Sequence, residues 1–355
     1  MRFASAEVIP YALPFKEPYV TARGVLRRRE MVLLRVRDPD GVVGLGEAVP
    51  LALRGGIGLA EVVRELEAWA ERQTTEGLSE PALCAVTTAR ADLLGRRVAE
   101  DGEGSDEAVP CNATLVAGSA SEVAAQAERW AADGFTTFKL KLGAESVKKG
   151  VEQPFSQTRV GDVEQVRAVR EAVGPEARIR VDVNEAWDLK TAKRTLAELE
   201  PLGIELAEQP VAGLEEMAEL AASTSIPLAA DESVASLEEA ERAAALGACA
   251  CTGIKLSKVG GPEAALAIAD VLPAYITSAL DGPVGIAAGA QVARSLAETG
   301  HPERLELAHG LATQRLFAET IASVECELRD GMLHLPPGPG LGVEIDEEAL
   351  QAHRI

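Results

Sequence analysis

The chain has 355 residues, 47% of them apolar, which is enough for one large barrel and a smaller domain with a substantial core. Its formal net charge of −21 would repel a phosphate backbone, so nucleic acid is excluded as a partner. The five cysteines have neither zinc nor redox spacing, and neither a signal peptide nor a membrane-spanning run is visible, so we expect a cytoplasmic protein with reduced thiols.

The first 108 residues are predicted to form an α+β domain. Apolar runs on either side of a turn at Asp40–Gly41 are typical of antiparallel strands, and apolar spacings of three and four residues indicate helices after them. The polar, glycine-bearing run at 101–110 then marks a domain boundary. The predicted strands lie at about 7–13, 31–36 and 42–49, and the predicted helices at about 59–73 and 81–98.

A second domain is predicted at 109–318, where short β-branched runs alternate with alanine-rich helical stretches. The runs lie near 111–116, 136–142, 178–183, 204–207, 227–230, 251–256, 274–278 and 304–308. The helices lie near 121–133, 160–173, 188–200, 213–222, 236–246, 261–271 and 284–298. Eight strands with seven intervening helices indicate a parallel α/β fold, and the regular period favours a closed, TIM-like barrel. The tail, 319–355, is expected to return to the N-terminal domain.

Charged residues recur once in each strand-helix unit of this pattern. Five of them lie in or at the end of a short apolar run: Lys141, Asp182, Glu208, Asp231 and Lys255. From Asp182 onward they follow one another at intervals of about 25 residues, the length of one strand, one helix and two short loops. We therefore expect them at the C-terminal ends of barrel strands, where such barrels build active sites.

The three acids favour a divalent metal site. Carboxylates gathered in a barrel mouth are costly to bury and raise each other's pKa values, and a hard cation with oxygen ligands removes that problem. Asp182, Glu208 and Asp231 are thus the predicted ligands of Mg²⁺, with Mn²⁺ as the alternative ion. The competing interpretation is that each acid caps the next helix, as Asp231 could do before ESVASLEEA.

Two of the lysines share one face of a predicted strand. In FKLKL the two-residue period places Lys139 and Lys141 together and the apolar residues on the opposite face. Mutual repulsion and partial burial are expected to lower their pKa values, which makes a lysine a competent base. Lys255 comes from a strand across the barrel and would reach the other face of a substrate. The alternative is that the lysines only form salt bridges with the acids.

Two further polar residues are candidates for substrate binding. Asn184 lies on the same face as Asp182 and could contact the metal shell or substrate, or serve as a turn residue. Asp281 follows the seventh strand and is either a pocket acid or a turn aspartate before Gly282. The long segment 143–158 leaves the strand of the lysines and is either a lid over the site or a disordered insertion.

These motifs resemble the muconate-lactonising subgroup of the enolase superfamily. The resemblance rests on Lys139-Leu140-Lys141, Asp182-Val183-Asn184, Glu208-Gln209-Pro210, Asp231-Glu232-Ser233 and Lys255 in KLSKVGG. It implies a (β/α)₇β barrel with an α+β capping domain formed by the N-terminal region and the C-terminal tail. Capping loops, here about 18–26 and 50–58, would select the substrate.

The resemblance also implies a chemistry. The family removes a proton α to a carboxylate, and a divalent ion stabilises the enediolate that forms. By this resemblance Lys141 is the base, Lys139 tunes it, and Lys255 is an acid/base or a cationic stabiliser on the other face. The resemblance implies a small carboxylate as the substrate and no membrane as a partner. A homo-oligomer is compatible with the family, although no interface is visible in the sequence.

Several reactions share this lysine pair. Arg23-Gly24 followed by 27–30 resembles the capping loop of actinobacterial-type o-succinylbenzoate synthases, which makes Arg23 a substrate-binding candidate. The Asp-x-Asp of dipeptide epimerases would need an acid at Ala279. We therefore favour dehydration to o-succinylbenzoate, a menaquinone-pathway step. Dipeptide epimerase, N-acylamino acid racemase, muconate-type cycloisomerase and a catalytically silent carboxylate-binding barrel stay open.

Overall fold

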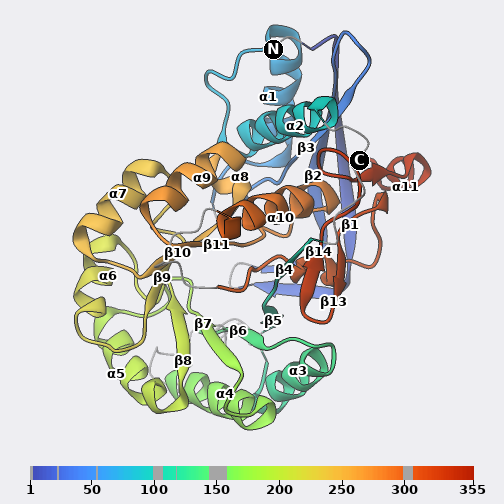
Figure 1. Cartoon of the computed structure of the whole chain (residues 1–355). Coiled ribbons are helices and arrows are strands. Elements are labelled where there is room, and N and C mark those ends of the chain that lie inside the picture. Colours follow the sequence, from blue (N-terminus) through green and yellow to red (C-terminus); the bar gives the residue numbers. More distant parts are fainter. Residues whose placement is uncertain are drawn as a thin grey trace.

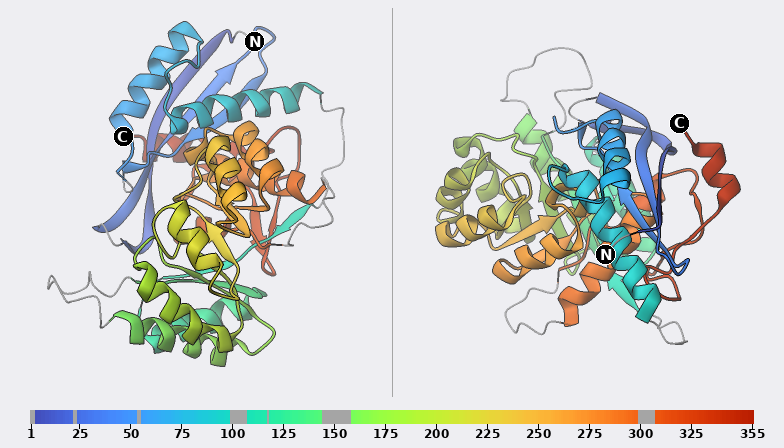
Figure 2. Two further views of the ribbon diagram at one scale, coloured as in Figure 1. Left: turned by 90° about the vertical axis from the view of Figure 1, so that its left-hand side faces the viewer. Right: turned by 90° about the horizontal axis from the view of Figure 1, so that it is seen from above.

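The structure, a computed structural model, describes residues 3–21, 24–52, 55–98, 107–116, 118–143, 158–298 and 307–355. A curled parallel sheet has helices along its outer side, and an antiparallel sheet with two helices packs across one end of it (Figures 1 and 2). This confirms the predicted α/β class, with a TIM-like barrel and an α+β cap.

The N-terminal sheet has the order β1-β2-β3 with antiparallel pairing throughout. Its elements are β1 (Ser5–Thr21), β2 (Gly24–Arg37), β3 (Val43–Ala48), α1 (Leu59–Arg72) and α2 (Glu80–Val98). Alternate residues of β2 face the two helices in one apolar cluster. Gly44 and Gly46 allow α2 to approach β3 closely, because a Cβ at these positions would lie 2.3 Å from Ala89 O and 1.9 Å from Ala85 O.

The barrel sheet runs β11-β10-β9-β8-β7-β6-β5 with parallel pairing. Its strands are β5 (Ala113–Leu115), β6 (Thr137–Lys141), β7 (Arg178–Asp182), β8 (Ile204–Glu208), β9 (Leu228–Ala230), β10 (Cys251–Ile254) and β11 (Ala274–Ile276). The eighth strand predicted at 304–308 lies mostly outside the described residues. His309 and Gly310 lie between the first and last strands of the sheet instead, where they form parallel bridges to Cys111 and Thr277.

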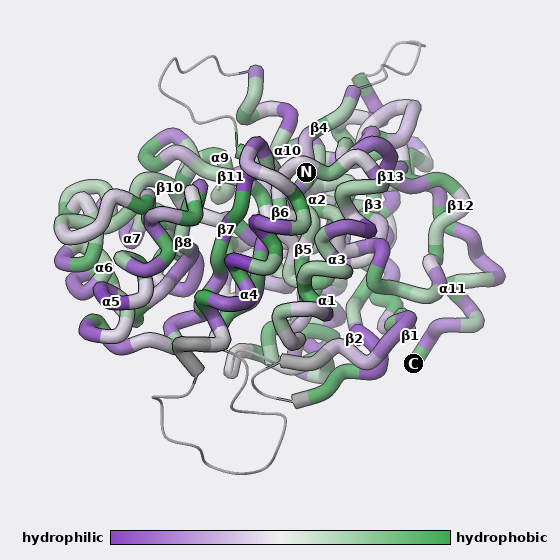
Figure 3. Tube along the Cα trace, turned by 90° about the horizontal axis from the view of Figure 1, so that it is seen from below, coloured by the Kyte–Doolittle hydropathy of each residue, from purple (hydrophilic) through white to green (hydrophobic). Residues whose placement is uncertain are grey.

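The helices that cover the sheet agree with their predicted positions. They are α3 (Ala120–Ala132), α4 (Thr158–Val173), α5 (Leu189–Leu199), α6 (Leu214–Ala221), α7 (Leu237–Leu246), α9 (Pro262–Val271) and α10 (Pro283–Glu298), with the short turns η3 (Glu200–Leu202) and α8 (Leu256–Val259) between them. Hydrophobic and hydrophilic segments alternate along α4 and α5 (Figure 3), as expected when one side of a helix packs on a sheet. Capping residues determine where several of these helices begin. Ser119, for example, forms a capping box with Glu122 at the start of α3.

The tail returns to the first domain, as predicted. After η4 (Ala312–Leu316), which lies within 109–318, the elements of the tail are β12 (Ala322–Val324), β13 (Glu327–Arg329), β14 (Met332–His334), β15 (Glu344–Ile345) and α11 (Glu347–His353). Ala318 N donates to Pro14 O (2.9 Å) and Ile355 N to Pro10 O (3.2 Å), both on β1. We propose domains at 1–108, 109–318 and 319–355, although β4 (Ala108–Pro110) pairs with β14 and joins the three.

Glu47 of β3 links the capping sheet to the barrel. Its buried carboxylate accepts hydrogen bonds from Tyr11 Oη (2.7 Å) and from Gly282 N (2.7 Å), the residue just before α10. Burial and the nearby charge of Asp281 raise the pKa of Glu47 to about 7, and the hydrogen bonds only partly oppose them. The folded state, in which Glu47 is buried at this contact, is thus more stable when Glu47 is protonated, although the two hydrogen bonds themselves favour the carboxylate.

Glu47→Gln is expected to remove a pH dependence of stability. Because the folded-state pKa is raised, the contribution of Glu47 is fully present below its unfolded value of 4.5 and is lost as pH rises through about 7. The wild type should therefore lose up to about 3 kcal/mol relative to the variant between about pH 5 and about pH 8. Urea unfolding of both proteins at the two pH values measures this, and a pH-independent difference would contradict it.

Candidate active site

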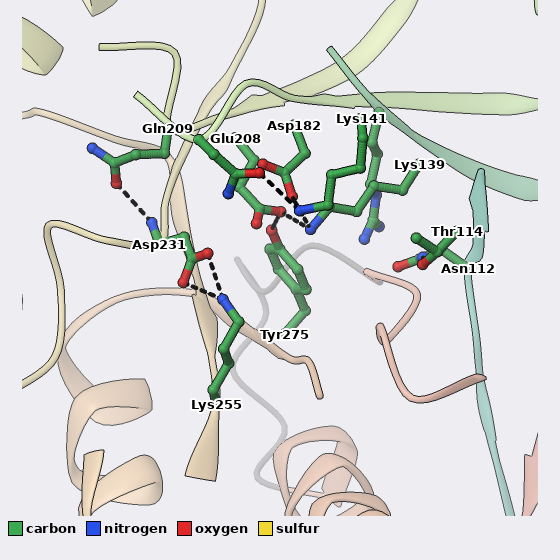
Figure 4. A network of polar contacts seen from close by, with 12 residues as sticks. Asn112, Thr114, Lys139, Lys141, Asp182, Glu208, Gln209, Asp231, Lys255 and Tyr275 are labelled. Atoms are coloured by element: carbon green, nitrogen blue, oxygen red, sulfur yellow. Dashed lines mark hydrogen bonds and ion pairs between the residues drawn. The ribbon is translucent and has the colours of Figure 1, made fainter. Parts of the chain in front are cut away.

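The residues singled out in the sequence converge at the C-terminal ends of neighbouring strands (Figure 4). Asp182 ends β7, Glu208 ends β8, and Asp231 follows β9; all three have no exposed surface. Lys139 and Lys141 come from β6, and Lys255 follows β10 on the other side of the acids. The side chain of Lys141 is 25% exposed and that of Lys139 only 7%, so Lys141 is the lysine of the pair that is open to solvent.

Each lysine is paired with a buried acid. Lys139 Nζ donates to Glu208 Oε2 (2.5 Å) and lies 2.9 Å from Asp182 Oδ2. Lys141 Nζ donates to Asp182 Oδ2 as well, and to Asn184 Oδ1 (3.0 Å). Lys255 Nζ donates to both carboxylate oxygens of Asp231. The salt bridges between the lysines and the acids, which the sequence offered as the alternative to catalysis, therefore exist. They link these residues into one network.

The pKa values within this network depend on burial and on the charges of the neighbouring residues. Burial alone would lower the pKa of Lys139, but the charges of Asp182, Glu208 and Asp231 together outweigh it and raise this pKa. The prediction of a lowered pKa was therefore wrong for Lys139, because it counted the neighbouring lysine and not the acids. Burial raises the pKa of Asp182, yet Lys139 and Lys141 bring it well below its usual range. Burial and the charge of Asp182 raise the pKa of Glu208.

The donor set suits a hard cation. Asp182 Oδ1 and Glu208 Oε1 are buried carboxylate oxygens that find no hydrogen-bond partner in the part of the chain that the structure describes. Such oxygens are costly without a ligand, and Mg²⁺ prefers carboxylate oxygens. Across the described ranges, however, no three Asp, Glu, His or Cys side chains are grouped closely enough to hold an ion. The ammonium groups of Lys139 and Lys255 lie beside the carboxylates and balance part of their negative charge.

The helix-cap interpretation of Asp231 is wrong. The residue before α7 is Ser236, and its hydroxyl accepts from Glu239 N as the N-cap. The carboxylate of Asp231 instead binds Lys255, inside the barrel mouth. Position at a strand end, not helix capping, therefore accounts for this acid.

The remaining predicted site residues lie in different surroundings. Asn184 accepts from Lys141 and donates to Glu232 Oε1 (2.9 Å), so it belongs to the network and orients Lys141. Asp281 Oδ2 accepts from Ser278 Oγ (2.6 Å) and from the backbone N–H of Ala279 (2.7 Å), as a turn aspartate does. Arg23 and residues 144–157 of the predicted lid lie outside the described residues.

Gln209 has a role that sequence reasoning missed. Its Oε1 accepts from Asp231 N (2.9 Å) and Ser233 N (3.1 Å), and its Nε2 donates to Ser233 Oγ (2.6 Å). Gln209 also adopts a positive φ of 38°, which turns the chain sharply after Glu208. The amide thus ties the ends of β8 and β9 together and fixes the two predicted metal ligands relative to each other.

Arg29 is a second residue whose structural role sequence reasoning missed. Its buried guanidinium donates to Pro50 O (2.7 Å) and to Ala279 O (3.2 Å). It therefore joins the start of the predicted 50–58 capping loop to the loop after β11. The run 27–30 signalled this position in the sequence, but only the tertiary fold shows what Arg29 contacts.

A family model described as "Enolase C-terminal domain-like" matches residues 122–349. The chain belongs to the enolase superfamily. It is 32% identical to a chloromuconate cycloisomerase of Pseudomonas putida, over 99% of this chain and 98% of that protein. It is 38% identical to an o-succinylbenzoate synthase of Thermobifida fusca (strain YX), over 59% of this chain and 61% of that protein.

Solved structures of superfamily enzymes share the complete fold. The muconate lactonizing enzyme from Pseudomonas fluorescens, complexed with muconolactone, has a TM-score of 0.80 and 29% identity, with 99% of both chains covered. A dipeptide epimerase from Enterococcus faecalis V583 has a TM-score of 0.84 over 97% of this chain and 100% of that one; at 24% identity this shows the fold alone.

Membership confirms the predicted resemblance and makes the protein an enzyme of the lyase and isomerase type. Enzymes of this superfamily act on small carboxylates and typically use Mg²⁺. Of the helices that the structure describes, none is long and apolar enough to cross a membrane.

Proposed function

We propose that this enolase-superfamily enzyme removes a proton α to a carboxylate, with Lys141 as the base. The observation that carries the proposal is the placement of Lys141 and Lys255 on opposite sides of three buried carboxylates. Lys141 comes from β6 and Lys255 follows β10, which are separated by three strands in the sheet. A substrate in the barrel mouth would thus have an ammonium group on each face.

Asp182, Glu208 and Asp231 are the residues that would hold Mg²⁺, or Mn²⁺ as the alternative. When bound, the ion supplies positive charge to the substrate carboxylate and stabilises the negative charge that develops as the α-proton leaves. Asn184 orients Lys141 Nζ through its side-chain oxygen. Lys139, whose pKa the neighbouring acids raise, is buried beside Asp182 and Glu208 and places a second positive charge next to Lys141.

Dehydration to o-succinylbenzoate is the reaction we favour. It requires one base that takes the α-proton and a cation that stabilises the opposite face. Lys255 suits the second role, because its ammonium group lies on the other side of the carboxylates from Lys141 and donates to both oxygens of the buried Asp231. The 38% identity to an o-succinylbenzoate synthase and the absence of an acid at Ala279 also support this choice.

Racemisation or epimerisation of an N-acylamino acid or dipeptide is the second candidate. The observation in its favour is the same pair of lysines, because inversion at a carbon needs a proton removed on one face and delivered on the other. The two reactions make different demands on Lys255: dehydration needs its charge, whereas inversion needs its proton transfer.

Lys255→Arg separates these candidates, since an arginine keeps the cation but does not deprotonate in proteins. With Mg²⁺ and the o-succinylbenzoate precursor, we expect Mg²⁺-dependent turnover by the wild type and retention of at least about a tenth of it by Lys255→Arg. Loss of precursor is followed by absorbance, and circular dichroism checks that the variant is folded.

Other outcomes of this assay would overturn the favoured reaction. A wild type that is inactive on the precursor but exchanges the α-protons of dipeptides or N-acylamino acids in D₂O is an epimerase or racemase. Turnover of muconate alone would identify a cycloisomerase. Neither turnover nor exchange on any of these substrates would leave the silent carboxylate-binding barrel.

A further inference from the structure

Tyr275 of β11 lies beneath the carboxylates, inside the barrel (Figure 4). It is fully buried, and its hydroxyl donates a hydrogen bond to Glu208 Oε2. Tyr275 is therefore a hydrogen-bond donor to one oxygen of a predicted metal ligand.

Neighbouring residues hold the ring in this position. Gly253 is the partner of Tyr275 across β10 and β11, and a Cβ at Gly253 would lie 3.0 Å from both Cζ and Oη of the ring. The guanidinium of Arg180 lies over the ring, 5.1 Å from its centroid. Arg180 is itself fully buried and donates to Glu205 and to Ala308 O (2.7 Å). The orientation of the phenol is thus set by the barrel interior.

The two oxygens of Glu208 differ as a result. Oε2 accepts from both Tyr275 and Lys139, whereas Oε1 is buried and finds no hydrogen-bond partner among the described residues. Two donors on the same oxygen fix the rotation of the carboxylate group. If Lys139 withdraws when a metal binds, Tyr275 still keeps Oε2 in place.

We propose that Tyr275 is a positioning residue that fixes the Glu208 carboxylate so that its other oxygen, Oε1, would be left available to a divalent ion, with Gly253 providing the space for the phenol. The inference rests on the proposed metal site of the enzyme. Hydrogen bonds to ligating groups tune metal affinity and typically contribute 10- to 100-fold.

Tyr275→Phe tests this, because it removes the hydroxyl and keeps the ring that packs on Arg180. We expect the Kd for Mg²⁺, measured by isothermal titration calorimetry without substrate, to rise by about 10- to 100-fold. Turnover should recover most of its wild-type kcat at saturating Mg²⁺, since the hydroxyl is fully buried and donates to Glu208. A purely structural role would instead lower stability without this split between metal affinity and kcat.

Tyr11→Phe is the matched control. Tyr11 is also fully buried and donates to a buried glutamate, Glu47, but that pair lies at the junction with α10. Its removal should lower stability and leave the Kd for Mg²⁺ unchanged. Gly253→Ala is a second variant, which keeps the hydroxyl but displaces it, and it should weaken Mg²⁺ binding as Tyr275→Phe does.

The outcomes are distinguishable. If the wild type binds Mg²⁺ and both Tyr275→Phe and Gly253→Ala bind it equally well, the positioning role is overturned while the proposed function stands. If the wild type itself binds no Mg²⁺, the metal site and the positioning role both fall. If Tyr275→Phe does not fold, the Mg²⁺ titration of Gly253→Ala alone tests the positioning role of Tyr275.

Discussion

Lys141→Ala is expected to lower kcat by at least about 1,000-fold and to leave the fold intact. A general base contributes typically 10²- to 10⁴-fold, and no other lysine of the site is as exposed to the barrel mouth. The fold should persist because the buried Asp182 remains paired with Lys139, 2.9 Å away. Turnover of the o-succinylbenzoate precursor and α-proton exchange in D₂O are the measurements.

The control for this experiment is Lys193→Ala. Lys193 lies on α5, outside the barrel mouth, and its ammonium group pairs with Glu219 at the surface. Removing this surface pair should change stability by no more than about 1 kcal/mol and turnover not at all. If Lys141→Ala keeps substantial turnover or exchange, Lys141 is not the base, and Lys255 becomes the residue to test next.

Glu208→Gln is expected to weaken Mg²⁺ binding by more than about 100-fold. Besides removing a charge, the substitution imposes an orientation on the new amide. Lys139 and Tyr275 both donate to Oε2, so the single amide oxygen must take that position. The NH₂ group then replaces Oε1, where it offers hydrogens instead of a lone pair to a metal. Calorimetric titration with Mg²⁺ measures the effect.

Glu47→Gln serves as the control in this titration. It changes a glutamate that is equally buried and also bonded to a tyrosine, but in the contact between β3 and the start of α10. Its Mg²⁺ affinity should match that of the wild type. Unchanged affinity in Glu208→Gln as well would remove Glu208 from the ligand set, and with it the three-carboxylate site.

Much of the architecture could be predicted from local pattern. The two-residue alternation in FKLKL placed Lys139 and Lys141 on the face opposite Phe138 and Leu140, and the structure has these two apolar residues in the core. Helix positions followed apolar spacing and capping residues. The closure of the barrel could not be located in this way, because His309 and Gly310 pair through isolated bridges and carry no strand pattern of their own.

The sequence by itself determined which charged groups meet, because parallel strands bring their C-terminal ends to one edge and Asp182, Glu208, Asp231 and Lys255 each end or follow such a strand. Only the tertiary structure decided what each group experiences there. The raised pKa of Lys139, the donation from Tyr275 to Glu208 and the buried contact of Glu47 all depend on side chains brought together from distant segments. Hydrogen bonds and desolvation act over a few ångströms in space, and local sequence patterns do not record those distances.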